Sequence, residues 1–257
     1  MHFNATIGRF ANRIANSQFT IDKTTYVLNS GSTHCLHGGV DGFDKRRFKL
    51  VDKSDNSLTY TLHSPDKDMG FPGNFDLTVV YTVTEDNELV ISYVGKCDQK
   101  TYACITNHAY FNLNGKNSSV LNHSVQIDSD YYLPLDKDSI PTGEKRKVDG
   151  GAFDFRQEKT LARDFRRDPQ MEAALGYDHP FLIKGDLNKA FIKVTSDDKK
   201  LSMEVYTDYP AFQMYTGNYV HQGDNNIIAR DDGLVYQDQC AVCIEPEFYP
   251  DCPHLEQ

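Results

Sequence analysis

The sequence has no tryptophan, no long apolar run and few basic clusters. None of its apolar stretches approaches the length that crosses a bilayer, and the N-terminus lacks a signal-peptide pattern. The formal net charge of -10 argues against nucleic acid as a partner, because binding its phosphates needs clustered Lys and Arg. The densest basic run, 145–147, reads as a solvated loop. We therefore expect a cytoplasmic protein without a membrane or nucleic-acid partner.

The six cysteines follow no regular framework. In a chain without an export signal, this indicates reduced thiols. Cys240 and Cys243 match the Cys-x-x-Cys pattern, and Cys252 and His254 would complete a zinc site. However, 235–244 reads as a strand, in which residues three apart point to opposite faces. The two cysteines would need a tight turn to bind one metal ion, and no Gly or Pro lies between them to favour it. We expect no structural metal.

Strand signals dominate the rest of the chain. The 15 Tyr and 15 Phe, with plentiful Thr and Val, favour pleated strands over helices. Alternating runs joined by polar turns predict hairpins within 19–28, 47–62, 77–94 and 190–207. Only 161–175 suggests a helix, interrupted by Pro169, and the longest irregular stretch is 134–158. We expect one all-β domain over residues 1–257, an antiparallel β-sandwich with few short helices.

The segment 106–113 reads as a strand with a polar face. Thr106, His108, Tyr110 and Asn112 share this face, because successive strand side chains point to opposite sides. An imidazole beside a phenol, a hydroxyl and an amide suits a hydroxyl-rich ligand, and it titrates near neutral pH. Taken alone, such a strand is more often a solvated sheet face.

A carboxylate stands at the end of an apolar strand near the C-terminus. Cys243 and Glu245 share one face there, while Val242 and Ile244 face the other way. Burying a carboxylate is costly unless it is paired, which favours a functional role over an edge-strand glutamate in water. Pro246 predicts that the chain leaves the sheet at this point.

Three further clusters are Gly8-Arg-Phe-Ala-Asn-Arg-Ile14, His34-Cys-Leu-His-Gly-Gly39 and Gly176-Tyr-Asp-His179. The first places a guanidinium beside an amide. The second places an imidazole before two glycines, where the backbone can approach a ligand closely. The third places a carboxylate in a predicted loop before Pro180. Singly, a surface arginine, a metal-like His-x-x-His coincidence and a turn-forming aspartate explain them equally well.

Together, these segments resemble the aldose 1-epimerase (galactose mutarotase) family, in order and over most of the chain. The seven resembling stretches are Ile7-Gly-Arg-Phe-Ala-Asn-Arg-Ile-Ala15, Leu36-His-Gly-Gly39 with Gly42-Phe-Asp-Lys45, Thr106-Asn-His-Ala-Tyr-Phe-Asn-Leu113, Ile140-Pro-Thr-Gly-Glu144 with Phe153-Asp-Phe-Arg156, Gly176-Tyr-Asp-His179, Gln213-Met-Tyr-Thr-Gly-Asn218 and Cys243-Ile-Glu-Pro-Glu-Phe-Tyr-Pro-Asp251. No single stretch is decisive, but seven in the right order are a strong indication.

The resemblance implies a galactose mutarotase-like β-sandwich and an isomerase that interconverts the α and β anomers of free aldohexoses, such as galactose and glucose. It implies that Glu245 takes the C1 hydroxyl proton and that His108 protonates the ring oxygen. Opposite charges at close range favour an ionised carboxylate and a protonated imidazole. The implied partner is a monosaccharide, and no cofactor or metal is required.

The implied sugar-binding residues are Arg13, Asn12, His37, Asp178 and Gln213. By resemblance, His37 and Gln213 lie near the anomeric centre and Asp178 accepts hydrogen bonds from hydroxyls remote from C1. Strand direction suggests that Tyr110 and Phe212 add apolar surface.

The chain departs from the family at both ends, so we expect the N-terminal strands and the C-terminal closing strands to be missing. A weakly active or non-catalytic sugar-binding protein on the same fold is therefore the main alternative. A glycoside hydrolase with Asp178 and Glu245 as its carboxylates would leave His108 without a role. A sugar-phosphate epimerase needs arginines around a phosphate, and the sequence around these motifs offers little beyond Arg9 and Arg13. Both a monomer and a homodimer are compatible with the sequence.

Overall fold

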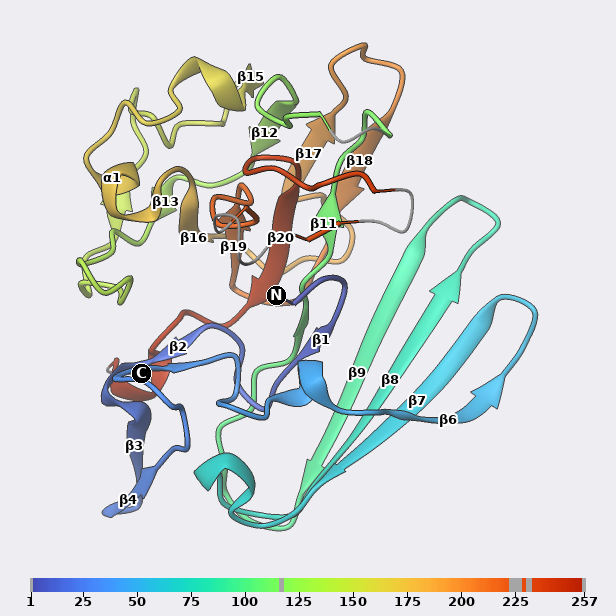
Figure 1. Cartoon of the computed structure of the whole chain (residues 1–257), viewed down its shortest axis with the longest axis vertical. Coiled ribbons are helices and arrows are strands. Elements are labelled where there is room, and N and C mark those ends of the chain that lie inside the picture. Colours follow the sequence, from blue (N-terminus) through green and yellow to red (C-terminus); the bar gives the residue numbers. More distant parts are fainter. Residues whose placement is uncertain (1, 116–117, 222–227, 230–232, 256–257) are drawn as a thin grey trace. The chain divides into compact units, whose positions relative to one another are not determined.

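A computed structural model describes residues 2–115, 118–221, 228–229 and 233–255. Strands prevail in it, with short 3-10 turns and one α-helix, α1 (Gln170–Ala174), which confirms the predicted all-β class (Figure 1). In these described ranges, no helix has the length and apolar character needed to cross a membrane. The chain forms two compact units, which we call the N-terminal unit (Thr6–Ile105 with Asp251–Gln257) and the central unit (Met1–Ala5 with Thr106–Pro250).

The N-terminal unit is built around a four-stranded antiparallel sheet in sequence order. Its strands are β6 (Lys49–Lys53), β7 (Ser57–Ser64), β8 (Phe75–Val83) and β9 (Leu89–Cys97). Alternate residues of β8, namely Phe75, Leu77 and Val79, pack against Phe43 and Ile105 to form its core. The predicted hairpins within 47–62 and 77–94 are confirmed.

Shorter elements complete this unit. They are β1 (Thr6–Ile7), β2 (Arg13–Ile14), β3 (Gln18–Ile21), β4 (Thr24–Val27), β5 (Cys35–Leu36) and the 3-10 turns η1 (Ala15–Ser17), η2 (Phe43–Lys45), η3 (Asp68–Gly70) and η5 (Cys252–His254). β3 and β4 form the hairpin predicted within 19–28, and β2 pairs with β5.

The central unit contains two antiparallel sheets. The six-stranded sheet has the order β11 (Tyr110–Phe111), β20 (Val242–Glu247), β19 (Ala211–Tyr215), β16 (Asp178–Leu182), β13 (Tyr131–Tyr132) and β14 (Arg146–Lys147). The four-stranded sheet has the order β15 (Lys159–Thr160), β12 (Ser124–Ile127), β17 (Ile192–Thr195) and β18 (Ser202–Val205). β17 and β18 confirm the hairpin predicted within 190–207. β10 (Thr106–Asn107) precedes β11.

Both sheets of the central unit contribute to one hydrophobic core. Phe181, Phe212 and Met214 of the six-stranded sheet join Val125 and Ile192 of the four-stranded sheet in this core. Because strand side chains alternate, the other face of the six-stranded sheet receives the residues between these apolar positions. Because side chains alternate along β19 and β20, the six-stranded sheet has one apolar face and one polar face.

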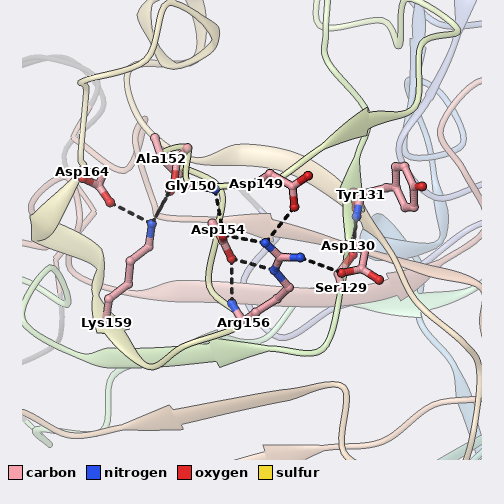
Figure 2. Close-up of polar contacts among 11 residues, drawn as sticks. Ser129, Asp130, Tyr131, Asp149, Gly150, Ala152, Asp154, Arg156, Lys159 and Asp164 are labelled. Carbon is pink, nitrogen blue, oxygen red and sulfur yellow. Dashed lines mark hydrogen bonds and ion pairs between the residues drawn. The ribbon is translucent and has the colours of Figure 1, made fainter.

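Arg156 organises the irregular stretch that the sequence predicts at 134–158. Its guanidinium reaches the carboxylates of Asp130, Asp149 and Asp154 at 3.0, 2.9 and 2.8 Å (Figure 2). Asp154 also accepts a hydrogen bond from the Gly150 N–H. These charge-assisted contacts act together with the short strand β14 and with Val148, Phe153 and Phe155, which are buried in the core of the central unit, to order this segment.

Lys159 is a buried cation at the end of this stretch. Its ammonium group lies 2.8 Å from an Asp164 carboxylate oxygen and donates to the Ala152 carbonyl at 2.7 Å (Figure 2). It also lies 4.3 Å from the centre of the Phe155 ring. Burial lowers the pKa of Lys159, and the Asp164 carboxylate opposes that shift.

Two predicted elements are wrong as single elements. The expected helix over 161–175 is a 3-10 turn, η4 (Leu161–Arg163), followed by α1, and Pro169 stands as the N-cap of α1. The expected strand over 106–113 is interrupted between β10 and β11, at His108 and Ala109. Pro169 marks the first break in the sequence, whereas nothing in the alternating pattern of 106–113 marks the second.

Two predictions about β20 are also wrong. The strand begins at Val242, after a turn at 238–240, and not at Val235. Pro246 does not end it, because Pro246 pairs with Phe212 and the strand continues to Glu247. β11 pairs with β20 at Val242 and Cys243, so Pro246 lies beyond the residues that pair with β11. The backbone N–H that proline lacks therefore interrupts no hydrogen bond to β11. All six cysteines lie in described residues and none forms a disulfide.

Candidate active site

Four strands place a row of side chains across the polar face of the six-stranded sheet. The row consists of Tyr110 of β11, Cys243 of β20, Tyr215 of β19 and Asp178 of β16, each opposite the next. Directly opposed residues in antiparallel strands point to the same face. Gln213 and Glu245 pair two residues further along and join this face. We call these six residues, together with His108, the polar face cluster.

His108 and Glu245 come together in this cluster. The His108 Nε2 lies 3.5 Å from the Glu245 Oε2, and the two side chains are only 5% and 3% exposed. The His108 backbone is fixed by its N–H, which donates to the Ala5 carbonyl, and by its carbonyl, which accepts from the Asn4 N–H, both at 3.0 Å. A buried carboxylate beside a buried imidazole can exchange a proton with a ligand held between or beside them.

Aromatic rings surround the His108 imidazole. The Tyr110 ring lies parallel to it, with centroids 5.0 Å apart and an interplanar angle of 9°, and Tyr215 meets it at 84° and 6.3 Å. His2 stacks against it at 5.6 Å. Burial raises the pKa of both tyrosines, so their phenols stay neutral at physiological pH.

The prediction that Phe212 adds apolar surface to the site is wrong. Phe212 is fully buried in the core of the central unit, on the opposite face from Gln213. Tyr110, the other residue of that prediction, lies on the polar face and is half-buried.

Asp178 and Gln213 form a second polar pair in the cluster. The Gln213 Nε2 donates to the Asp178 Oδ1 at 2.7 Å, and Gln213 is 3% exposed. Asp178 is the first residue of β16 and does not lie in a loop, as the sequence suggested, because Pro180 is accommodated within the strand opposite Gln213. Sheet pairing therefore fixes the position of this carboxylate.

Burial also defines two neutral groups near the pair. Cys243 is fully buried, and burial, followed by the nearby Glu245 carboxylate, raises the pKa of its thiol. His179 points to the core side of β16, where burial lowers its pKa to about 3. Cys243 is therefore a thiol and His179 a neutral imidazole at physiological pH.

The other predicted sugar-binding residues come together in the N-terminal unit. The Asn12 N–H donates to the His37 Nδ1 at 3.1 Å, and the His37 N–H donates to the Asn12 carbonyl at 2.9 Å. The Asn12 Oδ1 accepts from the Arg13 N–H at 2.9 Å. Because the His37 Nδ1 accepts a hydrogen bond, the neutral ring carries its proton on Nε2.

Arg9, from the same motif as Arg13, has a structural role. It is 2% exposed, and its guanidinium donates to the carbonyls of Pro72 and Gly73 and to the Ser64 Oγ, at 2.8, 3.0 and 2.6 Å. These contacts commit Arg9 to the fold of the N-terminal unit, so one of the two arginines that a sugar-phosphate site would need is engaged.

Sequence reasoning missed Tyr215 and His2. Tyr215 stands two residues after Gln213, so strand alternation alone would have placed it on the same face. The stacking of His2 on His108 has no local signal, since it depends on where the N-terminal segment lies in the fold.

Known proteins resemble this chain over nearly all of its length. Residues 1–257 match the family model described as aldose 1-epimerase. The chain is 44% identical to the aldose 1-epimerase of Escherichia coli over 253 residues, which cover 97% of this chain and 72% of that protein. It is 38% identical to the galactose mutarotase of Homo sapiens over 256 residues, 97% of this chain and 71% of that protein.

Solved structures show the same similarity. The aldose epimerase homologue from C. elegans superposes with a TM-score of 0.86 at 29% identity, covering 99% of this chain and 75% of that one. The galactose 1-epimerase from Lactobacillus acidophilus gives a TM-score of 0.84 at 26% identity, covering 97% and 72%. The predicted β-sandwich fold is thereby confirmed.

Proposed function

The chain belongs to the aldose 1-epimerase family of isomerases, and from this premise we propose that it interconverts the α and β anomers of free aldohexoses, galactose or glucose. The observation that supports this most strongly is the contact of 3.5 Å between His108 Nε2 and Glu245 Oε2, both buried on the polar face. A proton acceptor and a proton donor this close together suit a reaction in which one proton is removed from the substrate and another is supplied to it.

The proposed reaction opens and recloses the pyranose ring. Glu245 takes the proton of the C1 hydroxyl, the O–H electron pair forms the C1 carbonyl, and the bond from C1 to the ring oxygen breaks. The released electron pair on the ring oxygen takes the proton of His108. After rotation about the C1–C2 bond, the roles reverse and the ring closes on the other face of the aldehyde.

The geometry suits this exchange because the C1 hydroxyl oxygen and the ring oxygen are bonded to the same carbon. Two catalytic groups separated by little more than a hydrogen bond can therefore reach both oxygens. A positioned general acid or base contributes about 10²–10⁴-fold to a rate. The contact also gives His108 a role that a glycoside hydrolase based on Asp178 and Glu245 lacks.

Two other cluster residues, Gln213 and Asp178, are proposed to hold the sugar. The Gln213 Oε1 is buried and has no hydrogen-bond partner among the described residues, so it offers an acceptor for a sugar hydroxyl beside Glu245. Asp178 offers a carboxylate further along the sheet. Asn12, Arg13 and His37 are proposed as additional hydroxyl-binding residues, supported by the hydrogen bonds that hold them together.

Polarimetry on freshly dissolved α-D-galactose and α-D-glucose tests the catalytic pair. We expect the protein to accelerate mutarotation, and Glu245→Gln and His108→Asn each to lower kcat by about 10²–10⁴-fold. Glu204→Gln and His63→Asn are matched controls, because those side chains are 45% and 58% exposed, and they should keep full activity. An unchanged rate in Glu245→Gln would exclude it as the base, and binding without acceleration by the intact chain would favour the sugar-binding alternative.

Gln213→Leu tests sugar binding separately from chemistry. Leucine lacks the Oε1 acceptor proposed for a sugar hydroxyl, and a neutral hydrogen bond of about 0.5–1.5 kcal/mol corresponds to a KM increase of roughly 2–10-fold. Gln18→Leu, at an exposed position of β3, is the control. A KM that stays at the wild-type value in Gln213→Leu would remove Gln213 from the binding site.

A further inference from the structure

We propose that Tyr110 is a positioning residue for His108, holding the imidazole plane in place and favouring its protonated form. The rings of the two residues are parallel within 9° and their centroids are 5.0 Å apart. This role rests on the proposed function, since it is His108 that would deliver the proton to the ring oxygen.

The Tyr110 ring is itself fixed. The Tyr110 backbone pairs with Cys243 in β20, so the ring stands in the same row of the sheet as the Cys243 and Tyr215 side chains. Phe3 packs against it, with centroids 4.3 Å apart and an interplanar angle of 51°. A ring held by a strand and by a second aromatic side chain limits rotation of the imidazole that stacks on it.

The electrostatics of this stack favour the imidazolium. The face of an aromatic ring is negative, and it attracts a cation whose centre lies within about 6 Å. Burial, and to a smaller extent the neighbouring Cys243, Tyr215 and Glu245 groups, raises the pKa of Tyr110. Tyr110 therefore offers a neutral ring face to His108 and does not compete with it as a proton donor.

The other ionisable groups of the central unit that face His108 act differently. Glu245, at 3.5 Å, attracts the imidazolium but also receives the substrate proton. Tyr215 meets the ring nearly at a right angle, and His2 stacks at 5.6 Å and repels an imidazolium when it is protonated itself. Asp178 lies further away along the row that starts at Tyr110. Among these groups, Tyr110 is the one that sets orientation and charge together.

Histidine NMR tests the proposal without relying on activity. The protein labelled at its imidazole carbons and nitrogens is titrated as wild type, Tyr110→Phe and Tyr110→Leu, with His108→Asn and His2→Asn identifying the two signals. We expect the titration midpoint of His108 to fall by about one pH unit in Tyr110→Leu and to stay near the wild-type value in Tyr110→Phe, which keeps the ring. Equal midpoints in wild type and Tyr110→Leu would overturn the proposal.

A matched control removes a stacked tyrosine elsewhere in the same sheet. Tyr132 lies parallel to Phe153 at 4.1 Å, so Tyr132→Leu loses a similar aromatic pair. It should leave the His108 midpoint unchanged. If Tyr110→Leu does not fold, Tyr110→Met replaces the ring with a flexible side chain and carries the same expectation. A shift of equal size in Tyr132→Leu would mean that general loosening, and not the stack, moves His108.

Mutarotation kinetics on the same variants connect the stack to catalysis. In Tyr110→Leu, we expect the alkaline limb of the kcat profile to move to lower pH by the same amount, with KM changed less than twofold, and Tyr110→Phe to restore the profile. A kcat limb that stays in place while the NMR midpoint moves would overturn the catalytic part of the proposal. If His108→Asn keeps full activity, the proposed function fails while the NMR result still decides whether Tyr110 controls the His108 proton.

Discussion

Acidification should destabilise the protein through His179, a histidine buried directly beside a predicted sugar-binding residue. His179 is fully buried in β16, and its ring lies 4.7 Å from that of Phe153 and 6.2 Å from that of Tyr132. Its Nδ1 accepts the Asp178 N–H at 3.1 Å. Protonating this ring would place a charge among aromatic side chains and remove the acceptor that holds the Asp178 backbone.

The size of the effect follows from the difference in pKa between the two states. The pKa of His179 is about 3 in the folded protein and about 6.5 in the unfolded chain. Between these values, the unfolded state binds the proton and the folded state does not, so the free energy of unfolding rises with pH. The contribution of the neutral ring is complete above pH 6.5 and decreases as the pH falls. At pH 4, the folded protein should have lost about 3 kcal/mol.

Urea unfolding followed by far-UV circular dichroism at pH 7 and pH 4 measures this loss, since the chain has no tryptophan for fluorescence. His179→Asn removes the titrating ring and keeps a side-chain acceptor, so its pH-independent cost cancels when the two pH values are compared. We expect the wild type to lose about 3 kcal/mol more than His179→Asn between pH 7 and pH 4.

His63→Asn, at an exposed position, is the control for histidine loss and should follow the wild type. Parallel losses in wild type and His179→Asn would refute the reasoning, because the acid sensitivity would then come from other groups.

Two further predictions concern stability. Lys159→Met removes the buried cation of the Asp164 carboxylate and leaves it only the exposed Arg163 guanidinium at 3.5 Å, so it should lower the free energy of unfolding by about 3 kcal/mol. The double variant Lys159→Met/Asp164→Leu should regain most of this loss, and urea titration that finds the double variant no better than the single one would contradict the prediction. Gly38→Ala should cost more than about 2 kcal/mol, because φ is +89° and the new Cβ would lie 2.0 Å from the Gly8 carbonyl oxygen. Gly143→Ala is the control, because φ is +86° there and no atom lies within 4 Å of the new Cβ, so that only backbone strain remains. It should lower the free energy of unfolding by only about 1 kcal/mol. Equal losses of stability in thermal melts of the two variants would show that the contact with Gly8 is unimportant.

Local patterns predicted much of the fold. The hairpins β3–β4, β6–β7, β8–β9 and β17–β18 all follow from alternating runs joined by polar turns. The same patterns did not predict correctly whether a strand can continue through a proline. Pro180 and Pro246 lie inside strands, because whether a missing N–H matters depends on whether a neighbouring strand needs it.

The alternation of residues along each strand already predicts which side chains share a face. In β19 and β20, Gln213, Tyr215, Cys243 and Glu245 alternate with core residues, and this follows from the geometry of any extended chain. No local pattern predicts that β11, β20, β19 and β16 lie next to one another, since their pairing joins segments far apart in the chain. The contact of His108 with Glu245 and its stacking on Tyr110 arise from that pairing and from the bend before β11, which no local pattern encodes.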